Sequence, residues 1–295
     1  MTNAVLPIVF SAVFAAAGCT GGAPAQPPAG WIYQLQGYPE GRLDELARAP
    51  RPVAVIDLAR DAQADYFHAH EISEVRASGK KVLAYFEIGS IEDFRPEYAQ
   101  VVATEPELVL NRWPDWPNEY FVRYWEPRWW EGIVRARVDQ ALRAGFDGVY
   151  LDTPLAYEEV DLSLTPGQNR ETLARAMVDL IIRVSRYARS RDADFLIVPQ
   201  NSPELRLYSG YTEAIDGIGM EELFVRATDD PCTEPYCAEN LAHTRALRDA
   251  GKFVLAVDYA TRTELIRATC ARYRAERFAG FVTDRALDRV GTACM

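Results

Sequence analysis

The feature that most constrains the fold of this chain is a short apolar segment that recurs along its length and ends in a polar side chain. The clearest example is GFDGVYLDT (145–153), in which an apolar run leads directly into Asp152. Buried parallel strands have this form, and in a (β/α)8 barrel their carboxyl ends carry the active site. The pattern therefore predicts an α/β protein, a single-domain (β/α)8 TIM barrel with an acidic mouth. Further segments of this kind end at or just before Asp57, Glu87, Asn201, Glu221, Asp258 and Asp284.

Helical segments alternate with the apolar runs, as a barrel requires. We expect eight strands, at 31–35, 53–56, 81–86, 149–151, 195–198, 215–219, 253–257 and 278–282. We expect helices at 43–49, 65–78, 127–145, 173–188, 238–250 and 263–276.

Two connections, 91–126 and 154–167, are long for a barrel, and long loops are usually functional. The first is rich in aromatic residues, which either form a small core under the loop or offer stacking platforms for sugar rings.

The amino terminus resembles an export signal. Residues 4–17 form an apolar run of the length of a signal-peptide core, and the run leads to Cys19 in the manner of a bacterial lipobox. We predict a lipoprotein signal at 1–18 with Cys19 as the lipidated first mature residue, a flexible linker at 19–30 and the catalytic domain at 31–295. Plain secretion and an uncleaved anchor are the alternatives.

The four remaining cysteines agree with export, because disulfides persist in oxidising compartments. We expect the pairs Cys232–Cys237 and Cys270–Cys294, although four cysteines allow three connectivities. A zinc site is disfavoured, because the three histidines show no ligand spacing with the cysteines.

The formal net charge of −11 argues against nucleic acid as a partner, because phosphate binding needs a basic surface. A cationic polymer fits this charge better. The alternative is that an acidic surface merely keeps an exported protein soluble, which is sufficient to explain the charge.

Carboxylates at several strand ends indicate hydrolysis of a glycosidic bond, which needs one carboxyl group as acid and a second as nucleophile or base. Asp152 and Glu221 lie on strands far enough apart around the ring to face each other across a substrate. Any single strand-end acid can instead be an ion-pair partner of an arginine or lysine. A metal site built from Asp57, Glu87 and Asp152 is a further alternative. The sequence contains no phosphate-binding glycine loop, no G-x-S-x-G elbow and no H-E-x-x-H motif, so we expect no cofactor.

Several segments together resemble glycoside hydrolase family 114, the endo-α-1,4-polygalactosaminidase-related barrels. The resemblance spans about residues 31–284 and implies a barrel that cleaves α-1,4-linked galactosamine polymers. It implies catalysis by Asp152 and Glu221; Glu222 occupies a position that varies in the family, and Leu155 stands where many relatives have a second Asp. The segments that carry the resemblance are WIYQLQ (31–36), VID (55–57), YFEIGSIEDFRP (85–96), WPDWPNEYFVRYW (113–125), GFDGVYLD (145–152) and IDGIGMEELF (215–224).

The sequence thus predicts an exported, lipid-anchored and monomeric endo-glycosidase of the cell envelope that acts on an amino-sugar polysaccharide. Asp152 is expected as nucleophile or base and Glu221 as general acid, in an assignment that can be reversed. A non-catalytic carbohydrate-binding or assembly lipoprotein on the same fold is the alternative function. The residues expected to bind substrate are Asp57, Tyr85, Glu87, Trp116, Tyr157, Asn201, Glu222 and Asp258.

Overall fold

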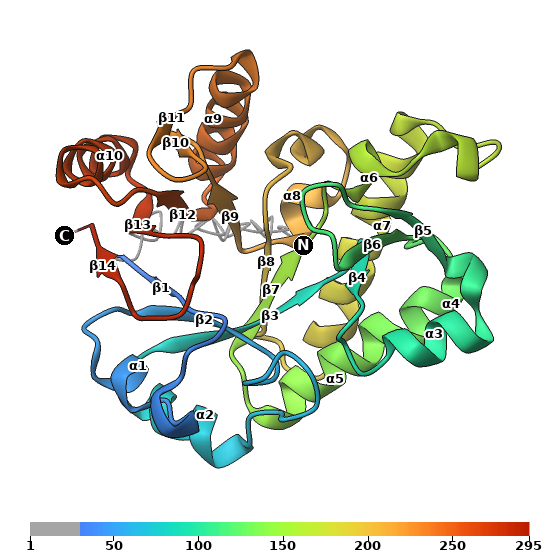
Figure 1. The fold of residues 1–295 in the computed structure, drawn as a ribbon, viewed down its shortest axis with the longest axis horizontal. Coiled ribbons are helices and arrows are strands. Elements are labelled where there is room, and N and C mark those ends of the chain that lie inside the picture. The colour runs from blue at the N-terminus through green and yellow to red at the C-terminus, as the bar shows by residue number, and fades with distance from the viewer. Residues whose placement is uncertain (1–29, 295) are drawn as a thin grey trace, which may run out of the picture.

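Eight parallel strands form the centre of the computed structural model, which describes residues 30–294 (Figure 1). Every predicted strand is present, and each predicted boundary lies close to the observed one. The (β/α)8 barrel is therefore confirmed. The strands are β1 (Ile32–Tyr33), β2 (Val53–Asp57), β3 (Lys81–Glu87), β7 (Gly148–Asp152), β8 (Leu196–Pro199), β9 (Gly217–Glu221), β12 (Phe253–Tyr259) and β13 (Ala279–Thr283).

The strands are arranged in two sheets that meet at β8 and β9. One sheet has the order β1-β2-β3-β7-β8, and the other joins β9, β12 and β13. Between β8 and β9, the amide of Asn201 donates to the carbonyl oxygen of Gly219 over 2.8 Å. On its far side, β13 pairs antiparallel with the short strand β14 (Thr292–Ala293). The amide of Leu35, just after β1, donates to the carbonyl oxygen of Leu287 over 2.8 Å and ties the first strand to the last connection.

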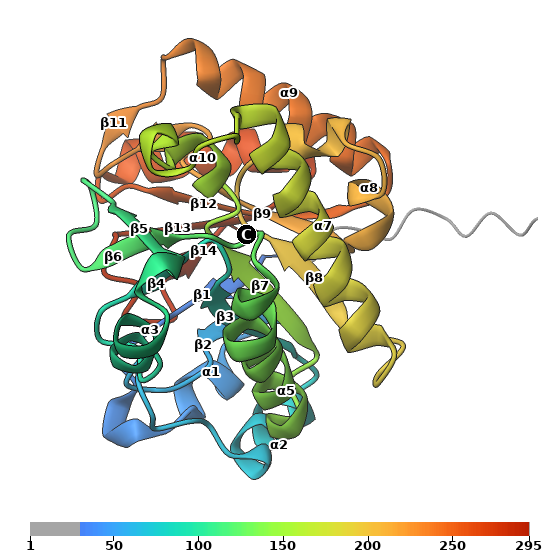
Figure 2. The ribbon, with the colours of Figure 1, turned by 90° about the vertical axis from the view of Figure 1, so that its right-hand side faces the viewer.

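Helices cover the outside of the barrel (Figure 2). The longest is α7 (Arg170–Arg189), and the side chain of the preceding residue, Asn169, accepts a hydrogen bond from the amide of Thr172 and caps the helix. Its buried face recurs at helical spacing, from Leu173 to Ala188, and packs toward the sheet. The helices are α1 (Asp44–Arg48), α2 (Ala69–Ala77), α3 (Tyr98–Thr104), α4 (Pro127–Trp129), the π-helical η3 (Trp130–Val134), α5 (Arg135–Ala144), α6 (Ala156–Glu159), α7 (Arg170–Arg189), α8 (Tyr211–Ala214), α9 (Pro235–Asp249) and α10 (Thr263–Glu276). Short 3-10 turns are η1 (Pro39–Gly41), η2 (Pro106–Leu108), η4 (Leu162–Leu164) and η5 (Pro203–Leu207).

Helix α2 begins later than the apolar periodicity predicts. Residues 65–68, expected to be helical, are irregular because Tyr66 forms an isolated antiparallel bridge with Ala59. The helix starts after His68, whose amide donates to the side chain of Glu71 over 2.8 Å in a capping box. Periodicity alone could not locate this start, because the bridge depends on a residue seven positions away.

The long connection 91–126 contains a small sheet of its own. Strands β4 (Ser90–Glu92), β5 (Val109–Arg112) and β6 (Glu119–Val122) pair antiparallel in the order β4-β6-β5. Phe121 is fully buried and packs against Trp113, whereas Trp116, at the tip of the β5–β6 hairpin, is 45% exposed. The expected local core is therefore present beneath the loop, and the stacking of a sugar ring on the exposed Trp116 stays a prediction.

Two disulfides are present and confirm the expected pairing, Cys232 with Cys237 and Cys270 with Cys294. Such bonds indicate folding in an oxidising compartment. Across residues 30–294, no helix combines the length and the apolar character needed to cross a bilayer. Cys19 and the predicted signal and linker lie outside the residues that the structure describes.

Candidate active site

Two partly buried carboxylates lie at the carboxyl ends of two barrel strands. Asp152 is the last residue of β7 and Glu221 the last residue of β9, with β8 between them. The chain turns sharply after each strand, with φ angles of 59° at Thr153, 59° at Asn201 and 57° at Glu222. Non-glycine residues seldom adopt this left-handed conformation, and such backbone strain concentrates at functional sites.

Asp152 is fixed by two hydrogen-bond donors. The hydroxyl of Tyr85, on neighbouring β3, donates to Oδ2 over 2.5 Å, and the amide of Thr153 donates to Oδ1 over 2.6 Å. Hydrogen bonds from neutral donors stabilise the ionised form of a carboxylate. The arrangement orients Asp152 and favours its negative charge.

Glu221 is held by donors from β8 and β12. The hydroxyl of Tyr259 donates to Oε1, and the side-chain amide of Gln200 donates to Oε2. Asn201 contacts both the backbone and the side chain of Glu221. Its Oδ1 accepts a hydrogen bond from the Glu221 amide over 3.0 Å, and its Nδ2 lies 3.4 Å from Glu221 Oε2. Gln200 and Tyr259 were not among the predicted site residues; the polar run at 199–201 and the tyrosine after Asp258 are their only sequence signals.

The two carboxyl groups influence each other's protonation. Burial and the nearby Glu221 charge raise the pKa of Asp152 to about 7. Burial also raises the pKa of Glu221, against the opposing effect of the Tyr259 hydrogen bond. Near neutral pH the pair therefore favours one shared proton, which leaves one group available as acid and the other as base.

A third carboxyl group, Glu119, lies near Asp152 and was not predicted from the sequence. Its Oε1 lies 2.5 Å from the hydroxyl of Ser90, which lies 2.9 Å from the hydroxyl of Thr153. The Thr153 hydroxyl is in turn 2.8 Å from the carbonyl oxygen of Asp152. Glu119 is buried, and burial together with the Asp152 charge raises its pKa to about 8. The Ser90 hydroxyl donates to Glu119, and this hydrogen bond opposes the rise in the Glu119 pKa that burial causes.

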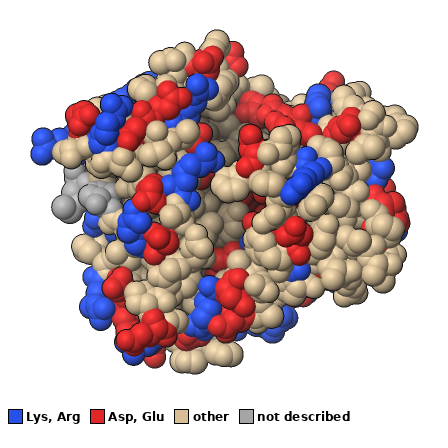
Figure 3. Space-filling view, viewed as in Figure 1, with Lys and Arg blue, Asp and Glu red and all other residues tan. Residues whose placement is uncertain are grey.

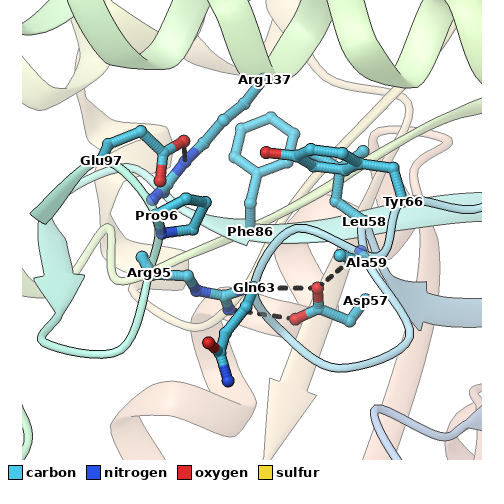
Figure 4. A pocket seen from close by; sticks show the side chains of 10 residues that line it. All are labelled: Asp57, Leu58, Ala59, Gln63, Tyr66, Phe86, Arg95, Pro96, Glu97 and Arg137. Atoms are coloured by element: carbon cyan, nitrogen blue, oxygen red, sulfur yellow. Dashed lines mark hydrogen bonds and ion pairs between the residues drawn. The ribbon is translucent and has the colours of Figure 1, made fainter.

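Asp57 and Glu87, which we expected to bind substrate, are buried and lie in an ion-pair network. Figure 4 shows the part of this network in which Arg95 meets Asp57. Arg95 donates from Nη1 to Asp57 Oδ1 over 3.1 Å and from Nη2 to Asp57 Oδ2 over 3.0 Å, and it also contacts Glu87. Arg137 donates to Glu87 Oε2 over 3.0 Å. Burial alone would raise the pKa of Glu87, but the two arginines outweigh it and lower this pKa to about 2. In this structure Asp57 and Glu87 are therefore ion-pair partners of arginines, which is the alternative that the sequence left open for any strand-end acid.

The same network bears on the metal-site alternative. Arg95 places a positive charge between Asp57 and Glu87, where a bound cation would have to lie. Within the described part of the chain, no group of three or more histidine, cysteine or acidic residues is placed to hold a metal ion. The residues present do not fit a carboxylate metal centre.

Asp258 is also fully buried and its carboxylate is engaged by protein groups. Its Oδ1 accepts from the amides of Phe224 and Val225, each over 3.0 Å, and its Oδ2 accepts from the hydroxyl of Tyr273. Burial raises its pKa to about 7. In this structure Asp258 holds the segment that follows Glu221, which makes it a positioning residue.

The other expected binding residues lie around the mouth. Tyr157 is buried with its hydroxyl on Glu204, and Glu222 accepts a hydrogen bond from the amide of Ala227 over 2.9 Å. Tyr85 and Asn201 contact the two carboxylates, as described above. Figure 3 shows a hollow in this face of the molecule with acidic side chains beside it.

A parallel eight-stranded barrel that carries two hydrogen-bonded carboxylates at its strand ends has the architecture of a glycosidase. The comparisons with known proteins agree. The family model of glycoside-hydrolase family GH114 matches residues 15–295, so the chain belongs to this family.

Relatives in sequence and in structure cover most of the chain. An uncharacterized protein of Deinococcus radiodurans is 33% identical over 263 residues, which is 88% of this chain and 82% of the relative. The glycoside hydrolase domain of PelA from Pseudomonas aeruginosa has a TM-score of 0.69 at 19% identity, covering 90% of this chain and 98% of that domain. Aspergillus fumigatus Ega3, solved in complex with galactosamine, also has a TM-score of 0.69, at 17% identity, covering 93% and 98%. These two structures share the fold of this chain.

Proposed function

We propose that the protein is an endo-acting glycoside hydrolase that cleaves an α-1,4-linked galactosamine-type polysaccharide with Asp152 and Glu221. The observation that carries this proposal is the pair itself, two carboxyl groups at strand ends whose pKa values are both raised by burial. Family membership supports the reaction class, and the galactosamine bound to Ega3 supports the sugar.

In this mechanism Asp152 is the nucleophile or base, and Glu221 protonates the departing glycosidic oxygen. Tyr85 and the Thr153 amide donate to Asp152, which orients the carboxylate for attack and opposes the rise in its pKa that burial causes. This mechanism requires the proton of the pair on Glu221, whose pKa is raised by burial. We expect retention of configuration at the anomeric carbon, which proton NMR of the initial product measures.

The choice of an amino sugar is supported by the charge of the mouth. The Glu221 charge raises the pKa of Asp152, and the Asp152 charge raises that of Glu119. Within residues 30–294, no lysine or arginine forms an ion pair with any of these three groups. A sugar that bears an ammonium group would lower the energy of such a cluster.

The first test is product release from partly deacetylated α-1,4-galactosamine polymer, followed by mass spectrometry. We expect short oligosaccharides from the wild type, and rates at least about a thousandfold lower from Asp152→Asn and Glu221→Gln. Two exposed helical residues provide matched controls, Asp179→Asn and Glu264→Gln, which should match the wild type. A polymer left intact by the wild type but bound by it would indicate the carbohydrate-binding alternative.

We also propose that Cys19 is lipidated and tethers the barrel to the cell envelope as a monomer. The lipobox-like sequence before Cys19 supports the anchor. Membrane partition of the wild type, compared with a soluble Cys19→Ala protein, tests the anchor, and sedimentation of residues 31–295 tests the monomer.

A further inference from the structure

Arg285 places a positive charge at the mouth, beside one of the two carboxylates. It lies in the connection between β13 and β14, with its guanidinium carbon 5.7 Å from the ring centroid of Tyr259. Because the Tyr259 hydroxyl donates to Glu221, one aromatic ring separates this cation from the candidate acid.

The charge of Arg285 is not neutralised by a neighbouring acid. The acidic residues on either side, Asp284 and Asp288, both form ion pairs with Arg289. Within residues 30–294, the exposed side chain of Arg285 contacts aromatic faces and makes no ion pair. A guanidinium on an aromatic face keeps its full positive charge.

The second aromatic face comes from a different segment of the chain, the β5–β6 hairpin. The guanidinium carbon of Arg285 lies 5.2 Å from the ring centroid of Trp116, at the tip of the β5–β6 hairpin. Trp116 is 45% exposed, and the amide of Glu119 donates to its carbonyl oxygen over 2.9 Å. Trp116, Tyr259 and Arg285 therefore define one position in the mouth, the Trp116–Arg285 subsite, where an exposed ring and a free cation meet.

We propose that the Trp116–Arg285 subsite selects an uncharged sugar unit, such as N-acetylated galactosamine, and rejects a unit with a free ammonium group. This inference rests on the proposed function. Two positive charges within a few ångströms at a solvated mouth lower affinity on the order of tenfold. An acetamido carbonyl has no such penalty and accepts a hydrogen bond from the guanidinium. The remaining mouth is acidic, so the protein prefers a chain that mixes charged and acetylated units.

The test uses α-1,4-galactosamine oligosaccharides of one length, either fully deacetylated or partly N-acetylated at known positions. For the wild type we expect kcat/KM about tenfold higher on the partly acetylated chains, with an acetylated unit at one fixed distance from each cut. Arg285→Gln should remove both the preference and the fixed position, whereas Arg285→Lys, which keeps the charge, should retain them. The same selectivity in Arg285→Gln and wild type, or a wild-type preference for free amines at every position, overturns the inference.

Equilibrium binding separates this inference from the proposed function. Asp152→Asn and Asp152→Asn/Arg285→Gln are titrated with both classes of oligosaccharide. The inference expects the affinity ratio between the two classes to fall about tenfold in the double variant. If the wild type binds the oligosaccharides without cleaving them, the hydrolase function is contradicted, but the affinity ratio still tests the inference. If neither class of oligosaccharide binds, both proposals are overturned.

Discussion

The phenol of Tyr85 lies 2.5 Å from Oδ2 of Asp152 and donates its hydrogen to that oxygen. A donor at this position favours the ionised carboxylate and lowers the pKa that burial has raised.

Tyr85→Phe should therefore slow the reaction and change its dependence on pH. Loss of one hydrogen bond to a charged group predicts a fall of roughly 10- to 100-fold in kcat/KM. Without the donor the pKa of Asp152 rises, so the acidic limb of the kcat/KM profile should move to higher pH. The matched control is Tyr187→Phe, whose hydroxyl contacts Asp139 on an outer helix. An unchanged acidic limb in Tyr85→Phe would contradict the role given to Asp152.

Glu119→Gln should change how stability depends on pH. The folded pKa of Glu119 is about 8 and its ordinary value is near 4.5, so the folded chain binds more protons between these values. The stability that comes from neutral Glu119 is complete below the unfolded pKa and is lost as the pH rises through about 8. The free energy of unfolding of Glu119→Gln minus that of the wild type should therefore increase from pH 5 to pH 9, by on the order of 4 kcal/mol. Urea titrations at both pH values measure this difference in unfolding free energy, and Glu264→Gln is the control. A difference that is the same at pH 5 and pH 9 would show that Glu119 is already ionised in the folded state.

Arg95→Met should strongly destabilise the protein. It leaves Asp57 and Glu87 buried without their shared cation, which predicts a loss of about 3–5 kcal/mol in the free energy of unfolding, measured by urea titration.

Asp57→Asn should destabilise the protein less than Arg95→Met, because the asparagine oxygen can still accept a hydrogen bond from the amide of Ala59. If Asp57 acts through the fold, KM of the folded Asp57→Asn protein should stay within about threefold of wild type. A tenfold rise in KM without a loss of stability would instead restore Asp57 to the substrate-binding residues.

The two disulfides should contribute unequally to the free energy of unfolding. Cys270 and Cys294 are 24 positions apart, whereas Cys232 and Cys237 are five apart. The chain-entropy relation predicts about 3.5 kcal/mol for the longer closure and about 2 kcal/mol for the shorter. Denaturant unfolding of Cys270→Ser/Cys294→Ser and Cys232→Ser/Cys237→Ser measures both, and a reversed order would rule out loop entropy as the main term.

The strands could be predicted because each is a buried apolar run, and the polar residue after each run locates the mouth. Asp57 and Glu87 show the limit of this reasoning, since the arginine that pairs them lies in a later segment whose folding the sequence pattern does not reveal. Glu119 was missed for a related reason. It belongs to an antiparallel hairpin inside a segment expected to be a loop, and its place near Asp152 depends on the pairing of β4 with β6.

The β5–β6 hairpin carries both an exposed aromatic ring and a buried carboxyl group on one short segment of the chain. Its tip presents Trp116 to the mouth, and the following strand begins with Glu119, near Asp152. The barrel strands that hold the two carboxylates contribute neither residue. Evolution therefore cannot exchange this hairpin to recognise a different sugar without also changing the surroundings of the Asp152 carboxylate, because Trp116 and Glu119 belong to the same turn and strand.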